Sequence, residues 1–270
     1  MKDLSNATFI IPIRIESQDR LRNVLTSVYF LLANFDTNII VKEVDSKSIF
    51  KTDVLPLLEG ADGIDLSKLT HIFEESNEPL FHRQKVLNEM IMEAKTKIVV
   101  NYDCDALLPL ESYTTAYAAV LSGQCDVVYP YGQGVYQYMV DATDDLVNKF
   151  IDSEFDFEIL KEQSKPENSD FGWVQFFDRD VYIKGGMENE NFRAYAPEDK
   201  ERHFRFNALG YKVGRINNLI YHLEHARGPN SWYNNPHMQH NLQLWSDLQR
   251  MDKKKLIEYY SNQEYLKKYQ

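Results

Sequence analysis

Residues 97–105 read KIVVNYDCD, an apolar run that leads directly into two aspartates, and this stretch decides how the rest of the chain is interpreted. Its β-branched residues predict a buried strand over Lys97–Tyr102, with Asp103 and Asp105 just beyond its end. Three further runs of this kind are predicted as strands: Thr8–Ile13, Ile39–Val44 and Asp126–Tyr131.

Helices are predicted between these strands, because apolar residues there recur at the spacing i, i+3, i+4 and i+7. They cover 19–35, Arg83–Ala94 and Pro109–Leu121. Ser17 or Asp19 is available to cap the first. The alternation predicts an α/β fold with a mostly parallel central sheet flanked by helices. Such sheets bind ligands beyond the carboxyl ends of their strands, where Asp103 and Asp105 fall.

The second half of the chain is less regular. The acidic segment Met139–Asp170 has weak patterning and is predicted to be an insertion or a mobile loop. The segment between Val44 and Arg83, rich in Asp, Gly and Ser, carries no assignment. The remaining predicted elements are a strand Trp173–Phe177, a helix Glu198–Leu209 ended by Gly210, strands Lys212–Ile216 and Leu219–Leu223, and two helices after Pro236.

Composition narrows the class of protein. Hydrophobic residues make up 43% and charged residues 26% of the 270, as in a folded soluble protein. The formal charge of −11 repels phosphate backbones, so no nucleic-acid partner is expected, although a local basic pocket could hold one nucleotide. Cys104 and Cys125 form no CxxC motif or disulfide framework. No signal peptide and no membrane span are predicted, so we expect a cytoplasmic protein.

Two pairs of residues have the chemistry of a metal site. Asp103 and Asp105 can share a divalent cation and a ribose, and Mn²⁺ or Mg²⁺ prefers such oxygen ligands. His222 and His225 could join them if the chain turns between the two, and imidazole favours Mn²⁺ or Zn²⁺ over Mg²⁺. The alternatives are a solvated aspartate pair in a turn and structural histidines.

Carboxylates and arginines supply two further signals. Glu198 and Asp199 open a helix, where they are either favourable charges at its dipole or a general base at the rim of a site. Arg14 follows the first strand and Arg83 starts a helix, positions that suit phosphate or a nucleobase, although isolated arginines are usually surface charges.

Taken in order, these segments resemble a glycosyltransferase of the GT-A fold. The likeness is to the β-1,4-galactosyltransferases and the bacterial chondroitin-polymerase type (family 2-like), over roughly Thr8 to Asn230. The motifs that carry it are Pro12-Ile13-Arg14, Phe81-His82-Arg83-Gln84-Lys85-Val86-Leu87-Asn88, Asp103-Cys104-Asp105, Glu198-Asp199, and His222 with His225.

The resemblance implies a role for each motif. The nucleotide of a UDP-sugar would lie on Pro12, Ile13, Arg14, Asp45, Phe81, Arg83, Asp103 and Cys104. Asp105 and His225 would bind the metal, Mn²⁺ or Mg²⁺, with His222 a second histidine ligand. Asp199 would be the base, with Glu198 beside it, and Tyr195 and Trp173 would contact the acceptor. The loop Ala226–Ser231 would be a lid over the donor.

The resemblance also implies a domain division and a reaction. Residues 1–235 would form the GT-A domain, with a nucleotide-binding half (1–131), an acceptor and metal half (171–235), and a helical tail (236–270). An inverting, metal-dependent transfer of a hexose or N-acetylhexosamine to a saccharide acceptor is expected, in surface polysaccharide or glycoconjugate synthesis. The oligomeric state is not predicted.

The chain departs from the family motif Trp-Gly-Gly-Glu-Asp. Tyr195, Ala196 and Pro197 stand where that motif has its Trp and two glycines, which puts the acceptor in doubt more than the chemistry. A nucleotidyltransferase is one alternative, but no glycine-rich loop follows the first strand. A catalytically silent sugar-nucleotide binder or scaffold is another, against which Asp199 and His225 count.

Overall fold

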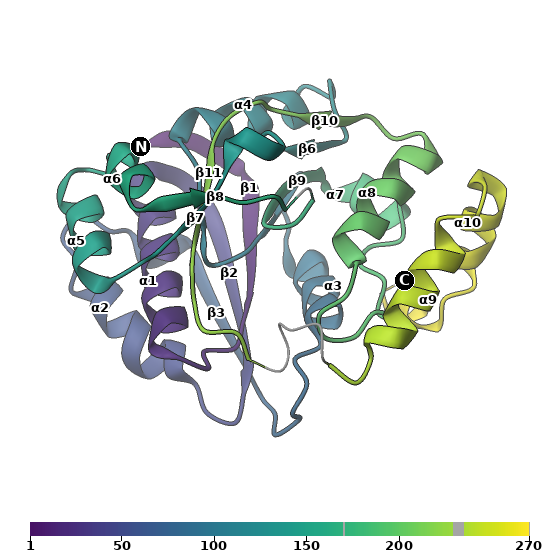
Figure 1. The fold of residues 1–270 in the computed structure, drawn as a ribbon, viewed down its shortest axis with the longest axis horizontal. Coiled ribbons are helices and arrows are strands. Elements are labelled where there is room, and N and C mark those ends of the chain that lie inside the picture. Colours follow the sequence, from purple (N-terminus) through teal and green to yellow (C-terminus); the bar gives the residue numbers. More distant parts are fainter. Residues whose placement is uncertain (170, 229–234, 270) are drawn as a thin grey trace.

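A computed structural model describes residues 1–169, 171–228 and 235–269, and its centre is a seven-stranded sheet (Figure 1). The strand order is β10-β6-β9-β4-β1-β2-β3. All neighbours run parallel except β9, which pairs antiparallel with β4 and β6. The strands are β1 (Lys2–Ile13), β2 (Phe35–Asp45), β3 (Leu69–Glu75), β4 (Ile98–Tyr102), β6 (Val127–Tyr129), β9 (Val174–Asp178) and β10 (Val213–Arg215). The predicted α/β fold with a mostly parallel sheet is confirmed.

Helices cover this sheet, and four of them begin within one residue of the position that the sequence predicted, at Gln18, Arg83, Leu110 and Glu198. The hydroxyl of Ser17 accepts a hydrogen bond from the amide of Arg20 and caps the first helix, so Ser17 is the cap and not Asp19. Gly210, in the left-handed conformation at φ 88°, ends the helix that begins at Glu198. The helices are α1 (Gln18–Asn34), α2 (Leu55–Glu59), α3 (Arg83–Glu93), α4 (Leu110–Leu121), α7 (Arg179–Lys184) and α8 (Glu198–Leu209).

The acidic segment 139–170 is folded into strands and helices, so the alternative of a mobile loop is wrong. It supplies β8 and the end of β7 to a second sheet, with order β5-β11-β7-β8, and it forms two amphipathic helices. The helices bury apolar side chains such as Phe150, which packs with Phe30 and Phe157, while their acidic faces point outward. The elements are β5 (Ala106–Leu107), β7 (Gln137–Val140), α5 (Asp144–Asp152), α6 (Phe157–Glu162), β8 (Ser164–Pro166) and β11 (Ile220–Leu223).

The unassigned segment after β2 contains α2, a π-helical turn (Phe50–Val54) and strand β3. β3 is the edge strand of the main sheet, with alternately exposed and half-buried side chains, so it lacks the apolar run of the inner strands.

Two helices at the C-terminal end, α9 (Met238–Leu248) and α10 (Lys253–Ser261), pack against α8 on the side away from the sheet (Figure 1). Their apolar faces form a second, smaller core with Phe192 and Ala196. The hydroxyl of Tyr260 donates to the buried carboxylate of Glu201 in α8, 2.6 Å away. The predicted tail is therefore attached to the helix that carries Glu198 and Asp199. Among the described residues, no helix is both long and apolar enough to cross a membrane.

Candidate active site

Asp105, His222 and His225 lie together beyond the carboxyl end of β4. Their ligand atoms lie within 4.8 Å of one another. His222 Nε2 is 3.3 Å from Asp105 Oδ1, and His225 Nε2 is 3.1 Å from Asp105 Oδ2. Asp105 and the two histidines come from two segments that lie more than 100 residues apart in the sequence. They meet because β11 pairs antiparallel with β5 and sets His222 opposite Ala106.

The donors of this cluster fit a first-row divalent cation. A carboxylate oxygen and two imidazole nitrogens suit Mn²⁺ better than Mg²⁺, which prefers oxygen alone. His225 Nδ1 lies 2.9 Å from the carbonyl oxygen of Ala226, and this contact favours the tautomer that leaves Nε2 free as a ligand. His222 Nδ1 is buried without a hydrogen bond, so only His225 has a backbone contact that orients its ring.

The charges of the cluster depend on one another. Burial alone would raise the pKa of Asp105, but the two imidazoles hold it well below its usual range. Burial opposes the charged form of His222, yet the carboxylate of Asp105 raises its pKa. Asp105 is therefore an anion, as a metal ligand must be. Burial raises the pKa of the Cys104 thiol, so Cys104 is neutral and is not a thiolate ligand.

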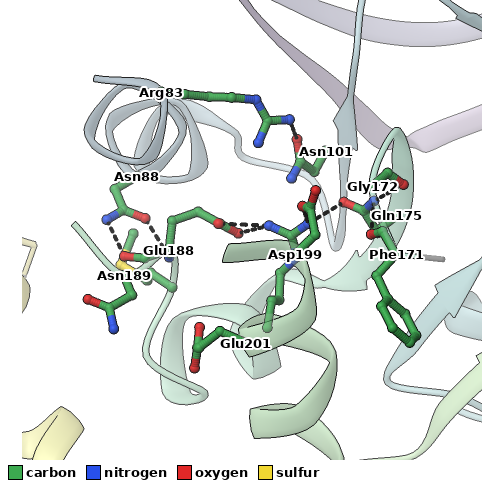
Figure 2. A network of polar contacts seen from close by, with 12 residues as sticks. Arg83, Asn88, Asn101, Phe171, Gly172, Gln175, Glu188, Asn189, Asp199 and Glu201 are labelled. Carbon is green, nitrogen blue, oxygen red and sulfur yellow. Dashed lines mark hydrogen bonds and ion pairs between the residues drawn. The ribbon is translucent and has the colours of Figure 1, made fainter. Parts of the chain in front are cut away.

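Asp103 faces away from this cluster toward α3. Its carboxylate pairs with the guanidinium of Arg83. Arg83 also donates to Asn101 (Figure 2). Burial raises the pKa of Asp103, with Arg83 opposing the shift and Asp105 adding to it. The predicted aspartate pair thus divides, with one member beside the histidines and the other beside an arginine.

The other predicted nucleotide residues gather where β1 and β2 end. The guanidinium of Arg14 donates to the carbonyls of Val44 and Glu78 and lies 5.6 Å from the centre of the Phe81 ring. Asp45 accepts from the amide of Ser46. β1 lies between β2 and β4, so these residues and Asp103 share one edge of the sheet. Pro12 and Ile13 are buried within β1, and the Ile13 side chain belongs to the core.

The first turn of α8 brings two carboxylates to the same edge. Asp199 pairs with Arg202 one turn along the helix, and Arg202 also donates to Gln175 in β9 at 3.1 Å. Pro197 precedes the helix and no side chain caps its first turn, so Glu198 and Asp199 do not act as caps. The negative charge of Asp199 also contributes to the raised pKa of Asp103.

Glu198 has an unusual environment for a carboxyl group. Its Oε2 is shielded from solvent and has no hydrogen-bond partner among the residues that the structure describes. Burial, followed by the negative charge of Asp199, raises its pKa well above the usual range. The raised pKa favours the protonated form of Glu198, so of the two neighbours Asp199 is the better candidate for a general base.

The two predicted acceptor residues differ in exposure. Trp173 is 7% exposed, and its ring packs on His222 and Tyr131 at centroid distances of 5.6 and 5.7 Å. Its backbone carbonyl accepts from the amide of Asp103, which ties β9 to the aspartate pair. Tyr195 is half-buried, and its carbonyl accepts from Asn235 and Asn241. Of the predicted lid Ala226–Ser231, residues 229–231 lie outside the described residues.

A buried polar network behind Asp199 was not predicted from the sequence. Figure 2 shows Glu188, Gln175 and Asp199 directed toward one region, where the guanidinium of Arg202 joins them. Arg202 and Glu188 are each 1% exposed. The only sequence signal was an arginine one turn after Asp199 in a helix that reads as polar throughout.

The fold is of the GT-A type found in glycosyltransferases. The mannosyltransferase PcManGT from Pyrobaculum calidifontis, solved in complex with GDP-Man and Mn²⁺, matches 81% of this chain with a TM-score of 0.50 and 14% identity. TarS 1–349 of S. aureus matches 83% of this chain with a TM-score of 0.51 and 16% identity. Its complex with UDP-GlcNAc matches 97% of this chain with a TM-score of 0.56 and 12% identity.

These likenesses are structural. The chain spans 56% of the PcManGT chain and 60% of the first TarS chain. No family model matches the sequence. No curated protein matches it either.

Proposed function

We propose that this protein is an inverting, metal-dependent glycosyltransferase that moves a hexose or N-acetylhexosamine from a UDP-sugar to a saccharide hydroxyl. The observation that carries the proposal is the cluster of Asp105, His222 and His225 at the edge of the sheet where such folds bind ligands. Two of the solved neighbours are complexes, one with GDP-Man and Mn²⁺ and one with UDP-GlcNAc, which supports a nucleotide-sugar donor.

Separate groups of residues would bind the metal ion and the nucleotide. Asp105, His222 and His225 would hold Mn²⁺. When bound, the cation supplies positive charge that offsets the negative charge developing on the departing diphosphate. Arg14 and Arg83 flank the carboxyl ends of β1 and β4 and provide the positive surface against which a nucleotide can bind.

Asp199 would act as the general base for the acceptor hydroxyl. Its carboxylate takes the proton of the acceptor hydroxyl while that oxygen forms a bond to the anomeric carbon. The bond from that carbon to UDP breaks at the same time, and its electron pair leaves with UDP. A single displacement from the opposite face inverts the anomeric centre and needs no nucleophilic carboxylate. Surface polysaccharide or glycoconjugate synthesis is the setting we propose.

Titration calorimetry with UDP tests the donor and metal parts together. With Mn²⁺ we expect a saturable isotherm that EDTA weakens at least roughly tenfold, because a bound cation would offset the negative charge of the diphosphate. Asp105→Asn keeps the size of the side chain but weakens the anionic ligand, so the Mn²⁺-dependent gain should be lost. Equal UDP affinity with and without Mn²⁺ in the wild type would contradict the proposal.

A further inference from the structure

The two oxygens of the Asp199 carboxylate have different surroundings. Oδ1 is paired with the guanidinium of Arg202. Oδ2 accepts no hydrogen bond from any residue that the structure describes, and it faces the backbone of Gly172. A Cβ atom at position 172 would lie 3.0 Å from Oδ2, so the absence of a side chain there keeps this oxygen accessible.

Arg202 is itself held in one position. One of its nitrogens donates to both carboxylate oxygens of Glu188, at 2.8 and 2.7 Å, and another donates to Gln175 at 3.1 Å. Glu188 is fixed in turn, because its backbone amide and carbonyl bond to the side chain of Asn88 (Figure 2). A planar guanidinium with several donors can satisfy all these partners at once, whereas an ammonium cannot.

Building on the proposed function, we infer that Arg202 is a positioning residue that holds Asp199 Oδ1, so that Oδ2, reached past Gly172, accepts the acceptor proton. In the transfer step the acceptor O–H bond breaks and its proton passes to Oδ2. The acceptor oxygen bonds to the anomeric carbon, and UDP leaves with the electron pair of the broken bond. Arg202 remains protonated throughout and contacts neither substrate.

The test compares two conservative variants in the full chain. Arg202→Lys keeps the positive charge but loses the planar guanidinium group whose nitrogens bond to Asp199, Glu188 and Gln175. Arg205→Lys is the matched control, because Arg205 is equally buried in α8 and bonds to Glu201 and to backbone carbonyls, without contacting Asp199. Both variants should lower the melting temperature.

Only Arg202→Lys should change catalysis selectively. We expect its turnover at saturating donor to fall roughly 10- to 100-fold, because misplacing a reacting group by about 1 Å costs that much. Its dissociation constant for UDP with Mn²⁺ should stay within about threefold of the wild type. Arg205→Lys should keep turnover within about threefold per folded molecule. Equal turnover in the two variants would overturn the assignment of Arg202.

Carboxyl ¹³C NMR gives a readout that does not depend on activity. The Asp199 resonance, assigned by its loss in Asp199→Asn, should move in Arg202→Lys and stay in Arg205→Lys. An unmoved resonance in Arg202→Lys would refute the contact even in an active enzyme. A wild type that moves no sugar would instead refute the proposed function, and the role of Arg202 in transfer with it, whatever the NMR result.

Gly172→Ala tests the access route to Oδ2. The added methyl group would crowd Oδ2 and lie 3.4 Å from the hydroxyl of Ser169. We expect the kcat/KM for the acceptor to fall roughly tenfold or more while UDP affinity is kept. Unchanged acceptor kinetics in this variant would show that the proton does not leave by this route.

Discussion

Replacing Asp199 by asparagine separates an enzyme from a protein that only binds nucleotide sugars. The side-chain amide oxygen that Asp199→Asn introduces can still accept from Arg202, and Arg202 keeps its buried bonds to Glu188. The Asp199 side chain is partly exposed, at 31% accessibility, and the buried Arg202 keeps Glu188 as its counter-charge, so the replacement should cost only about 1 kcal/mol of unfolding free energy. The fold and the metal cluster, to which Asp199 does not belong, should persist.

Transfer should respond very differently. A positioned general base contributes on the order of 10²–10⁴-fold, which corresponds to about 2.7–5.4 kcal/mol of activation free energy. We therefore expect turnover to fall at least roughly 100-fold, with the UDP dissociation constant changed less than about threefold, as for an interaction made in the transition state.

The assay follows UDP release at saturating donor and acceptor, and calorimetry measures UDP binding in the presence of Mn²⁺. Glu198→Gln is the matched control, because Glu198 is adjacent to Asp199 but its pKa is raised well above the usual range, which favours its protonated form. Wild-type turnover in Asp199→Asn would refute the assignment of the base. If Glu198→Gln alone abolished transfer, Glu198 would take that role.

Three further predictions concern the histidines, Glu198 and the C-terminal helices. His225→Ala should abolish the dependence of activity on Mn²⁺, whereas His222→Ala should only change which cation is preferred. The reason is that, of the two histidines, only His225 has its second ring nitrogen beside a backbone carbonyl. Full Mn²⁺-dependent activity in His225→Ala would be inconsistent with the site. Because the pKa of Glu198 is raised in the folded protein, the unfolded chain releases this proton at a lower pH than the folded protein does, and the group costs stability as the pH rises above about 4.5. Glu198→Gln should therefore raise the melting temperature more at pH 8 than at pH 4. An equal change at both values would argue against the raised pKa. Tyr260→Phe should lower the unfolding free energy, measured by denaturant titration, by about 1–3 kcal/mol, because the buried carboxylate of Glu201 loses a hydrogen-bond donor. An unchanged unfolding free energy would mean that the contact does not form.

Local signals in the sequence predicted much of the central sheet and its helices. The run before Asp103 is β4, and α8 spans Glu198–Leu209 as expected, because Pro197 and Gly210 mark its two ends. Spacing also placed Asp103 and Asp105 after a strand, and a parallel sheet brings such residues to one edge.

What the sequence did not predict depends on contacts between distant segments. The second sheet forms because β11 pairs with β5 and β7, which joins residues near 106, 140 and 220. Such long-range pairing produces no local pattern in the sequence. Arg202 and Arg205 resemble surface charges in a polar helix, yet both are buried because Glu188 and Glu201 neutralise them. Edge strand β3 was missed because its side chains alternate in exposure and resemble a loop.

The most direct test of the account is a mass-spectrometric screen of purified protein with Mn²⁺ and four donors: UDP-Gal, UDP-GalNAc, UDP-GlcNAc and UDP-Glc. Enzymes that bind a sugar nucleotide beside a cation also pass the sugar slowly to water, so free UDP appears without a known acceptor. The account predicts UDP release from at least one donor, lost with EDTA and in Asp105→Asn. Release from none of the four, by protein that is folded and loaded with Mn²⁺, would contradict it.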